Sequence, residues 1–182
     1  GDVIAGLLPR TPDLVATIRE LCRMVVVPPD GLAFDPDFQT NFRFYVSYTA
    51  SNGDTVIARY AAPSATSDVA NVTATTILRL PQPFENHNGG SMAFGPDGFL
   101  YVGLGDGGDG NDPGNRAQDI TNLLGKFLRL NVNGDDFPAD PNKNYRIPST
   151  NPFVGAVPGA DEIWSFGWRN PWKWAFDRRF LG

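Results

Sequence analysis

The chain has 182 residues, a formal net charge of −5, and 41% hydrophobic against 19% charged residues. This length suits one domain with its own core, and the composition excludes a disordered chain. The negative charge argues against a nucleic-acid-binding protein, because phosphate groups require a basic surface, and it gives no attraction to anionic membranes. No apolar run reaches the roughly 20 residues of a membrane-spanning helix, and no signal-peptide pattern opens the sequence. We therefore expect a globular protein with no nucleic-acid partner and no transmembrane segment.

Residues 1–30 carry the weakest structural pattern. Leu14, Ile18 and Leu21 recur at helical spacing, which predicts a short helix over Asp13–Met24. The single cysteine, Cys22, lies in this stretch and excludes both an internal disulfide and a zinc site built from several thiolates. A buried structural thiol is the expected role, because a free cysteine behaves as a small apolar residue.

From residue 31 to residue 182 the sequence predicts short β-strands joined by tight turns. The 20 glycines, 16 prolines and 12% aromatic residues are typical of such a chain. The expected strands are 32–34, 42–48, 55–61, 73–80, 91–94, 99–104, 126–132, 162–167 and 172–176, of which the last two form a pair. One or two helical turns are expected within 118–124, and 133–149 reads as a long polar loop.

A short motif recurs and indicates repeated units. Leu32-Ala33-Phe34 and Met92-Ala93-Phe94 each lead through a polar turn to a strand with Tyr-Val, and Trp174-Ala175-Phe176 is a weaker third copy. Self-similarity at this scale is typical of stacked or radially repeated units. With strands in place of helices, it predicts an all-β fold, a β-propeller, against the alternative of a β-sandwich.

The number of blades predicts that this chain is part of a propeller. Four-stranded blades of roughly 40–60 residues would number only three or four here, fewer than most propellers contain. An open ring exposes strand edges. We therefore expect assembly with missing blades or with other chains.

The only histidine, His87, is the first candidate catalytic residue. It stands between Asn86 and Asn88 and is followed by Gly89 and Gly90, which let a ligand or another backbone approach closely. An imidazole titrates near neutral pH and is suited to take a proton from an alcohol. His87 is therefore a candidate general base, against the plainer interpretation of a structural or exposed histidine.

The loop Gly105–Asn115 is rich in oxygen ligands. The residues that suit Ca²⁺ by chemistry are Asp106, Asp109, Asn111 and Asp112. Their spacing differs from that of an EF-hand and no glutamate closes the loop, so a turn-rich loop is the preferred interpretation. A weaker case of the same kind is Asn131, Asn133, Asp135 and Asp136.

Arg169 and Asn170 form the third candidate site, between Trp168 and Trp172. An arginine beside flat rings offers a fixed guanidinium to an anionic, planar ligand. The alternative is an arginine stacked on tryptophan at the rim of the core.

Several motifs occur in an order that is more specific than any one of them. They include His87-Asn88-Gly89-Gly90, Phe94-Gly95-Pro96-Asp97-Gly98, Gly105-Asp106-Gly107-Gly108, Leu123-Leu124-Gly125-Lys126 and Gly167-Trp168-Arg169-Asn170-Pro171. In this order, the sequence from about residue 31 to residue 182 resembles the N-terminal half of the glucose/sorbosone dehydrogenase family. These are soluble aldose sugar dehydrogenases that use pyrroloquinoline quinone (PQQ).

The resemblance implies a six-bladed β-propeller, of which residues 31–182 supply roughly the first three blades. It implies PQQ near the central axis, held partly through Ca²⁺. It also implies His87 as the base that accepts the proton of the sugar's anomeric hydroxyl, and contacts from Arg169 and Asn170 to PQQ. A sugar substrate, an external electron acceptor and a periplasmic or extracellular location follow from the family alone.

Two departures from the family pattern limit what is carried over. Val25–Asp30 stands where the family has a glycine-rich Gly-Leu-Leu-Gly stretch, so no cofactor contact is assigned there. The later blades that supply Ca²⁺ ligands lie outside this sequence, so no metal ligand is named. Two other functions stay open: a non-catalytic binding propeller of the hedgehog-interacting type, and a fragment that is inactive alone.

Overall fold

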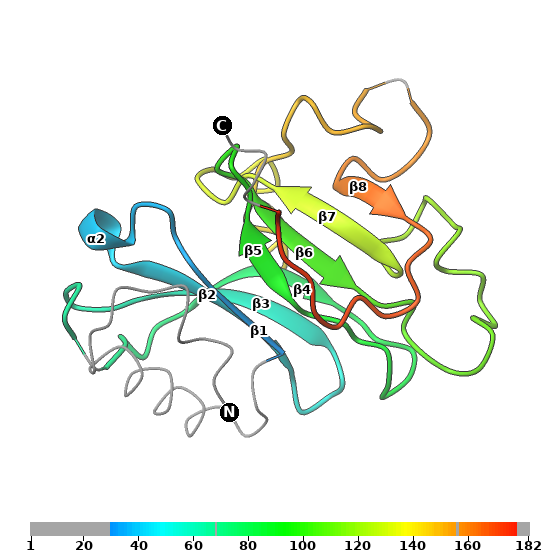
Figure 1. The fold of residues 1–182 in the computed structure, drawn as a ribbon, viewed down its shortest axis with the longest axis horizontal. Helices are drawn as coiled ribbons and strands as arrows, with labels where there is room; N and C mark the ends of the chain where they lie inside the picture. Colours follow the sequence, from blue (N-terminus) through cyan, green and yellow to red (C-terminus); the bar gives the residue numbers. More distant parts are fainter. Residues whose placement is uncertain (1–29, 68, 156, 178–182) are drawn as a thin grey trace.

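The computed structural model describes residues 30–67, 69–155 and 157–177. They form two four-stranded antiparallel sheets, one after the other in the chain (Figure 1). The first sheet contains β1 (Gly31–Phe34), β2 (Arg43–Thr49), β3 (Thr55–Ala61) and β4 (Thr75–Leu80). The second contains β5 (Met92–Phe94), β6 (Leu100–Leu104), β7 (Lys126–Leu130) and β8 (Ile163–Phe166). The helix expected over Asp13–Met24 lies outside the described residues and stays a prediction.

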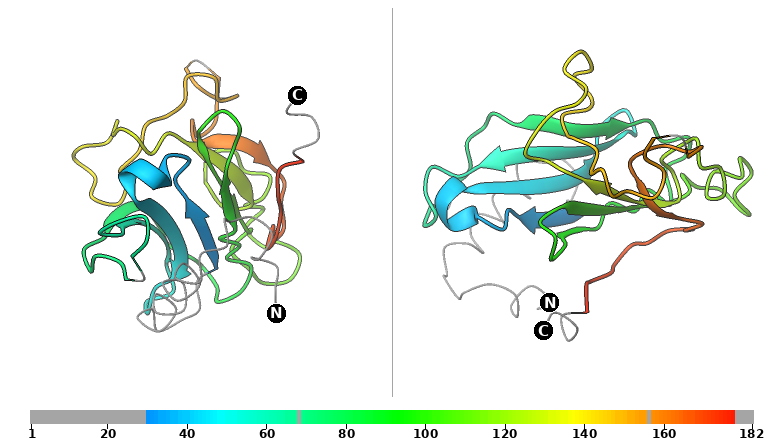
Figure 2. Two further views of the ribbon diagram at one scale, coloured as in Figure 1. Left: turned by 60° about the vertical axis from the view of Figure 1, so that its left-hand side comes forward. Right: turned by 90° about the horizontal axis from the view of Figure 1, so that it is seen from above.

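The two sheets are neighbouring blades of a β-propeller. In each sheet every strand pairs with the next strand in the chain, and the two first strands, β1 and β5, contact each other (Figure 2). A Greek-key sandwich would exchange strands between its sheets. Consecutive four-stranded meanders that meet at their first strands are the repeating unit of a propeller, so the all-β propeller prediction is confirmed.

The third copy of the repeated motif follows the second blade without forming a strand. The predicted pair of 162–167 with 172–176 is wrong, because β8 pairs with β7 and residues 174–177 form no regular element. This segment runs along the second sheet, where the Trp174 indole donates to the carbonyl oxygen of Ser91 at 3.1 Å. The Phe176 ring packs edge-on against Tyr101, 5.0 Å between centroids. The described residues thus contain two complete blades and the motif that opens the next repeat.

The main hydrophobic core lies between the two blades. Tyr45 of β2 is fully buried in it, and the partly buried Phe94 of β5 packs against Tyr45 edge-on, with ring centroids 5.3 Å apart. Phe44 and Val46 point to the opposite face of β2 and build a second, smaller cluster. Successive side chains of a strand alternate between its faces, so β2 is buried on both sides as an interior strand should be.

The segment 133–149, expected to be a long polar loop, folds back onto the edge of the first blade. The amide of Arg79 donates to the carbonyl oxygen of Asn142 at 3.0 Å, and the amide of Asn144 donates to that of Ile77 at 2.9 Å. This docking covers part of β4, which would otherwise be an open sheet edge. Tyr145 in the same segment is fully buried and donates its hydroxyl to Glu162, 2.7 Å away.

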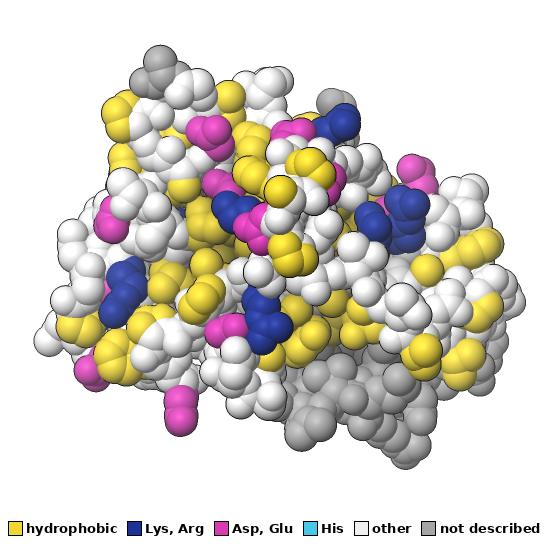
Figure 3. All heavy atoms as spheres, turned by 180° about the vertical axis from the view of Figure 1, so that it is seen from behind, with side chains coloured by type: hydrophobic (Ala, Val, Ile, Leu, Met, Phe, Trp, Pro, Cys, Tyr) yellow, Lys and Arg dark blue, Asp and Glu magenta, His cyan; other side chains and the backbone are white. Residues whose placement is uncertain are grey.

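Helices contribute little to the described part of the chain. The one helix there, α2 (Phe38–Asn41), has four residues, and the helical turns expected within 118–124 are irregular turns. Among these residues no helix is long and apolar enough to cross a membrane. On the face drawn in Figure 3, lysine and arginine side chains form separate patches, most of them beside acidic side chains.

Candidate active site

The predicted site residues lie at one end of the strands of both sheets, because the order of the strands brings the connecting segments together there. In an antiparallel meander alternate strands run the same way, so the segments that follow β4, β6 and β8 leave from the same edge. His87 lies in the segment after β4, Asp106 lies two residues after the end of β6, and Arg169 lies in the segment after β8. Residues that are far apart in the sequence therefore meet there.

His87 and Asp106 form a hydrogen-bonded pair. The Nδ1 atom of His87 lies 2.9 Å from Oδ1 of Asp106, whose side chain is 1% exposed, while that of His87 is 17% exposed. The same Oδ1 accepts a hydrogen bond from the amide of Gly108 at 3.0 Å. A carboxylate only accepts hydrogen bonds, so the proton of the neutral imidazole lies on Nδ1 and Nε2 is left as an acceptor.

His87 adopts an unusual backbone conformation that its glycine neighbours support. Its φ angle is +58°, in the left-handed region that few residues other than glycine occupy. Gly89 has a φ of +68°, and a Cβ atom placed there would lie 2.6 Å from the carbonyl oxygen of Gly103. The predicted close backbone approach beside His87 is therefore present, and the approaching chain is β6 of the same protein.

Backbone hydrogen bonds fasten the segments of the site to one another. The amide of Asp106 donates to the carbonyl oxygen of Arg169 at 2.8 Å, and the amide of Gly125 donates to that of Gly105 at 2.6 Å. A Cβ atom on Gly105 would collide with the carbonyl oxygen of His87 and lie 3.1 Å from that of Arg169. Glycine at position 105 is therefore required for the three segments to close together.

Arg169 reaches the same carboxylate from the other side. Its Nη1 atom lies 3.7 Å from Oδ2 of Asp106, and 58% of its side chain is exposed. The Trp168 ring packs edge-on against Phe127, with centroids 4.9 Å apart, and its indole donates to Ser165. Asn170, the next residue, is also exposed. Arg169 therefore turns its charge toward Asp106 and solvent.

The remaining acidic residues of the loop Gly105–Asn115 hold its turns. Asp109 accepts a hydrogen bond from the amide of Gly110 at 2.8 Å, and Asp112 accepts from those of Arg116 and Ala117, each at 2.9 Å. Across the described ranges, no three histidine, cysteine, aspartate or glutamate side chains gather to hold a metal ion. The loop is turn-rich, as the preferred interpretation had it.

Two residues near the site were missed as such from the sequence. The sequence pattern predicts Asp106 only as a Ca²⁺ ligand, and the signal for another role is its place two residues after a strand. Lys126 is fully buried, and burial lowers its pKa to about 8. Its Nζ atom donates to the carbonyl oxygens of Arg116, Ala117 and Leu124 at 2.7, 3.2 and 2.6 Å. It thereby ties the loop after β6 to the start of β7.

Comparison with known proteins decides the family. The family model described as Glucose / Sorbosone dehydrogenase matches residues 30–180. The chain belongs to this family. Among curated members and relatives, the HIPL1 protein of Arabidopsis thaliana is 36% identical over 191 residues, which cover 81% of this chain and 28% of that protein. The Hedgehog-interacting protein of Mus musculus is 32% identical (81% and 22% covered).

Proteins named as enzymes belong to the same group. The aldose sugar dehydrogenase YliI of Escherichia coli (strain K12) is 32% identical, with 75% of this chain and 34% of that protein covered. Of the solved structures, the PQQ-bound aldose sugar dehydrogenase of Streptomyces coelicolor superposes with a TM-score of 0.56 at 30% identity. That match covers 77% of this chain and 36% of the Streptomyces chain. The chain therefore spans well under half the length of the family members it matches.

Proposed function

We propose that this chain, as part of a longer protein, serves the PQQ-dependent oxidation of an aldose sugar. The observation that carries the proposal is the His87–Asp106 pair, which leaves Nε2 of His87 as the proton acceptor. His87 would take the proton of the sugar's anomeric hydroxyl as general base. When bound, PQQ supplies a two-electron acceptor for the hydride of the anomeric carbon, and an external acceptor then takes the electrons.

Asp106 and Arg169 would set the charge around this base. The imidazolium that forms on proton transfer lies against a buried carboxylate, which stabilises it and holds the ring in place. Arg169 approaches the other carboxylate oxygen at 3.7 Å, so a positive charge lies on the side of Asp106 that faces away from His87. General-base catalysis of this kind contributes about 10²–10⁴-fold to a rate.

The exposed residues beside the pair suit PQQ, a planar anion. Arg169 presents a guanidinium that is more than half exposed, and a guanidinium fork matches carboxylates in two parallel hydrogen bonds. Asn170 adds an exposed amide next to it. We assign the cofactor contacts of this chain to Arg169 and Asn170. Ca²⁺ is proposed from the family only, and no ligand for it is assigned in this chain.

A titration of the 182-residue chain with PQQ and Ca²⁺, followed by tryptophan fluorescence, tests the site. Trp168 and Trp172 are 43% and 66% exposed and flank the assigned contacts, so binding should quench them. Arg169→Gln should weaken binding about tenfold or more, the worth of one hydrogen bond to a charged group. Arg146→Gln is the matched control, because Arg146 is also 58% exposed and paired with one aspartate, Asp136.

Each result of this titration has a definite meaning. Saturable quenching that Arg169→Gln weakens about tenfold or more supports the site, and unchanged quenching in that variant refutes the assignment of Arg169. If the 182-residue chain fails to bind and the complete protein binds and oxidises sugar, the chain is a fragment that is inactive alone. If neither binds PQQ, the proposed function is wrong.

A non-catalytic binding propeller is the second candidate function. The similarity to HIPL1 and to the Hedgehog-interacting protein favours it, since these relatives are at least as similar to the chain as the named dehydrogenase. Sugar oxidation by the complete protein with PQQ separates the two functions. The periplasmic or extracellular location, the electron acceptor and the division into residues 1–30 and 31–182 stay predictions.

A further inference from the structure

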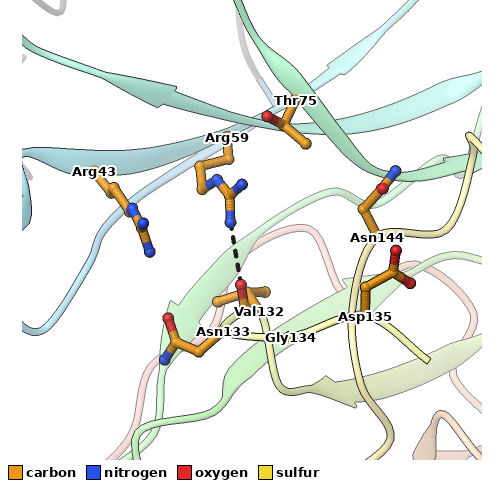
Figure 4. Close-up of a pocket in the computed structure, with 8 residues that line it drawn as sticks. All are labelled: Arg43, Arg59, Thr75, Val132, Asn133, Gly134, Asp135 and Asn144. Carbon is orange, nitrogen blue, oxygen red and sulfur yellow. Dashed lines mark hydrogen bonds between the residues drawn. The ribbon is translucent and has the colours of Figure 1, made fainter. Parts of the chain in front are cut away.

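A pocket lies between the two blades and is lined by residues of both (Figure 4). Its volume is about 280 Å³, and its walls are Arg43, Arg59, Thr75, Val132, Asn133, Gly134, Asp135 and Asn144. The first three come from β2, β3 and β4, and the others from the segment that follows β7. No aromatic side chain lines it, and all but two of the lining residues carry a polar side chain.

This pocket is separate from the site at His87. Arg43 begins β2 and Thr49 ends it, and the Thr49 hydroxyl accepts a hydrogen bond from Asn88, the neighbour of His87. Seven residues of strand span roughly 20 Å. The pocket therefore lies at the opposite end of the strands from His87, where the segment after β7 leaves the second blade.

One side of the pocket carries two positive charges. Arg43 and Arg59 are both half-buried and point into the pocket (Figure 4). Among the ion pairs of the described residues, none includes either of them. Arg59 donates from Nη1 to the carbonyl oxygen of Val132 at 3.3 Å, which aims its guanidinium across the gap between the blades. Both positive charges line one pocket at partial burial, so an oxyanion bound in it would be stabilised.

The other side of the pocket offers acceptors. Asp135 uses Oδ1 to accept from the amide of Phe137 at 2.7 Å, so its Oδ2 stays available. Asn144 uses its Nδ2 atom to donate to the carbonyl oxygens of Thr76 and Pro141, so its Oδ1 stays available. A carboxylate and an amide oxygen accept from hydroxyl groups, and the Asp135 charge disfavours a second anionic group at this side.

We propose that this pocket binds a small hydroxylated oxyanion, the chemistry of a sugar acid or a sugar phosphate. The oxyanion lies between Arg43 and Arg59, and its hydroxyl groups donate to Asp135 and Asn144. Asn133, on the same side of the pocket as Arg43 in Figure 4, adds an amide donor for the anion. The proposal rests on two guanidinium groups that line one pocket and belong to no ion pair among the described residues, and it is independent of the redox function proposed for the site at His87.

Isothermal titration of the 182-residue chain with four probes tests the proposal. The probes are gluconate, glucose 6-phosphate, inorganic phosphate and glucose. Gluconate and glucose 6-phosphate should bind, inorganic phosphate more weakly, and glucose not measurably. Preference for one of the two anionic sugars tells a sugar acid from a sugar phosphate. Binding should weaken as salt rises, because the attraction is between charges at a partly exposed site.

Variants then locate the binding. Arg43→Gln should weaken binding of the preferred probe about 10- to 100-fold, the loss of one or two hydrogen bonds to a charged group. Asn133→Ala, a change at an exposed side chain, should weaken it by a smaller factor. Arg79→Gln, which removes the same charge near the opposite end of the first sheet, should leave it unchanged. Near-ultraviolet circular dichroism checks that each variant is folded.

Three results would overturn the inference. Equal binding of glucose and gluconate would show that the charge is not recognised. Equal binding of inorganic phosphate and glucose 6-phosphate would show that the hydroxyl groups of the ligand are not recognised by Asp135 and Asn144. Unchanged affinity in folded Arg43→Gln and Asn133→Ala would show that the probe binds at another site.

Discussion

The Nδ1 atom of His87 lies 2.9 Å from Oδ1 of Asp106, a carboxylate that is 1% exposed. The two residues are 19 positions apart in the sequence. His87 lies in the segment between β4 and β5, and Asp106 lies in the segment between β6 and β7. The contact fixes which nitrogen of the ring carries the proton and which can accept one. The ring of a histidine in a polar loop is thereby held in one orientation.

The tautomer of His87 is the first prediction. In the folded 182-residue chain, the neutral imidazole should carry its proton on Nδ1, because the carboxylate of Asp106 accepts it. Long-range nitrogen–proton NMR measures this directly, and the signals are unambiguous because the chain has one histidine. Asp106→Asn should weaken the preference, whereas Asp109→Asn in the exposed loop should not. A wild-type ring protonated on Nε2 would refute the pairing.

Turnover of the complete protein gives the second prediction. His87→Ala should lower the rate of sugar oxidation by about 10²–10⁴-fold, since the general base is lost. Glu85→Ala, an exposed change in the same loop, should keep the rate. Steady-state assays with PQQ and an artificial electron acceptor measure the turnover of both variants and of the unchanged protein. Near-normal turnover in His87→Ala would refute the proposed mechanism.

Replacement of Gly105 by alanine is the third prediction. The added methyl group would collide with the carbonyl oxygen of His87 and lie 3.1 Å from that of Arg169. We expect a loss of about 1–3 kcal/mol in the free energy of unfolding, the usual cost of overpacking, and a changed NMR spectrum of His87. Gly110→Ala is the control, because a Cβ atom there meets nothing within 4 Å. Equal stability of the two variants in urea titrations would contradict the close approach.

A buried arginine inside the second blade gives the fourth prediction. Arg129 donates twice to Oδ2 of Asp97, at 3.0 and 2.7 Å, and its side chain is 7% exposed. Arg129→Ala should cost about 1–3 kcal/mol of unfolding free energy, because it leaves the buried Asn151 Oδ1 without its donor, whereas the carboxylate of Asp97, 31% exposed, can turn to water. Arg146→Ala, at a surface pair, should cost about 0–1 kcal/mol. Thermal or urea unfolding of both variants measures the two losses of stability, and equal losses would contradict the prediction.

The fifth prediction is a dependence of stability on acid. Burial alone would raise the pKa of Asp97, but hydrogen bonds from Arg129, Tyr101 and the Phe99 amide outweigh it and hold the pKa below its ordinary value. The unfolded chain therefore takes up this proton first as the pH falls. The contribution of Asp97 is complete above the ordinary carboxyl pKa and is lost toward lower pH. Asp97→Asn should flatten the fall in unfolding free energy below about pH 4, and an unchanged slope would contradict this.

Much of the fold could be predicted from the sequence because its signals are local. Alternating side chains in 43–49 and 55–61, with the turn residues between them, determine a hairpin by the geometry of strands and turns alone. The repeated Leu32-Ala33-Phe34 and Met92-Ala93-Phe94 indicated equivalent first strands, and these are β1 and β5. His87, Arg169 and Asn170 could be proposed from the types and order of their neighbours.

Only the tertiary structure decided which distant residues meet. The partner of His87 is Asp106 because the segments after β4 and β6 leave from one edge of the blades, which no local pattern in 81–91 contains. Arg59 meets Val132 73 positions later because the segment after β7 folds back onto the first blade. The copy at Trp174 reads as a strand locally, yet strand pairing requires a neighbour with free hydrogen-bonding groups in register. Sequence pattern specifies strands through nearest neighbours, whereas contacts between loops depend on how whole blades pack.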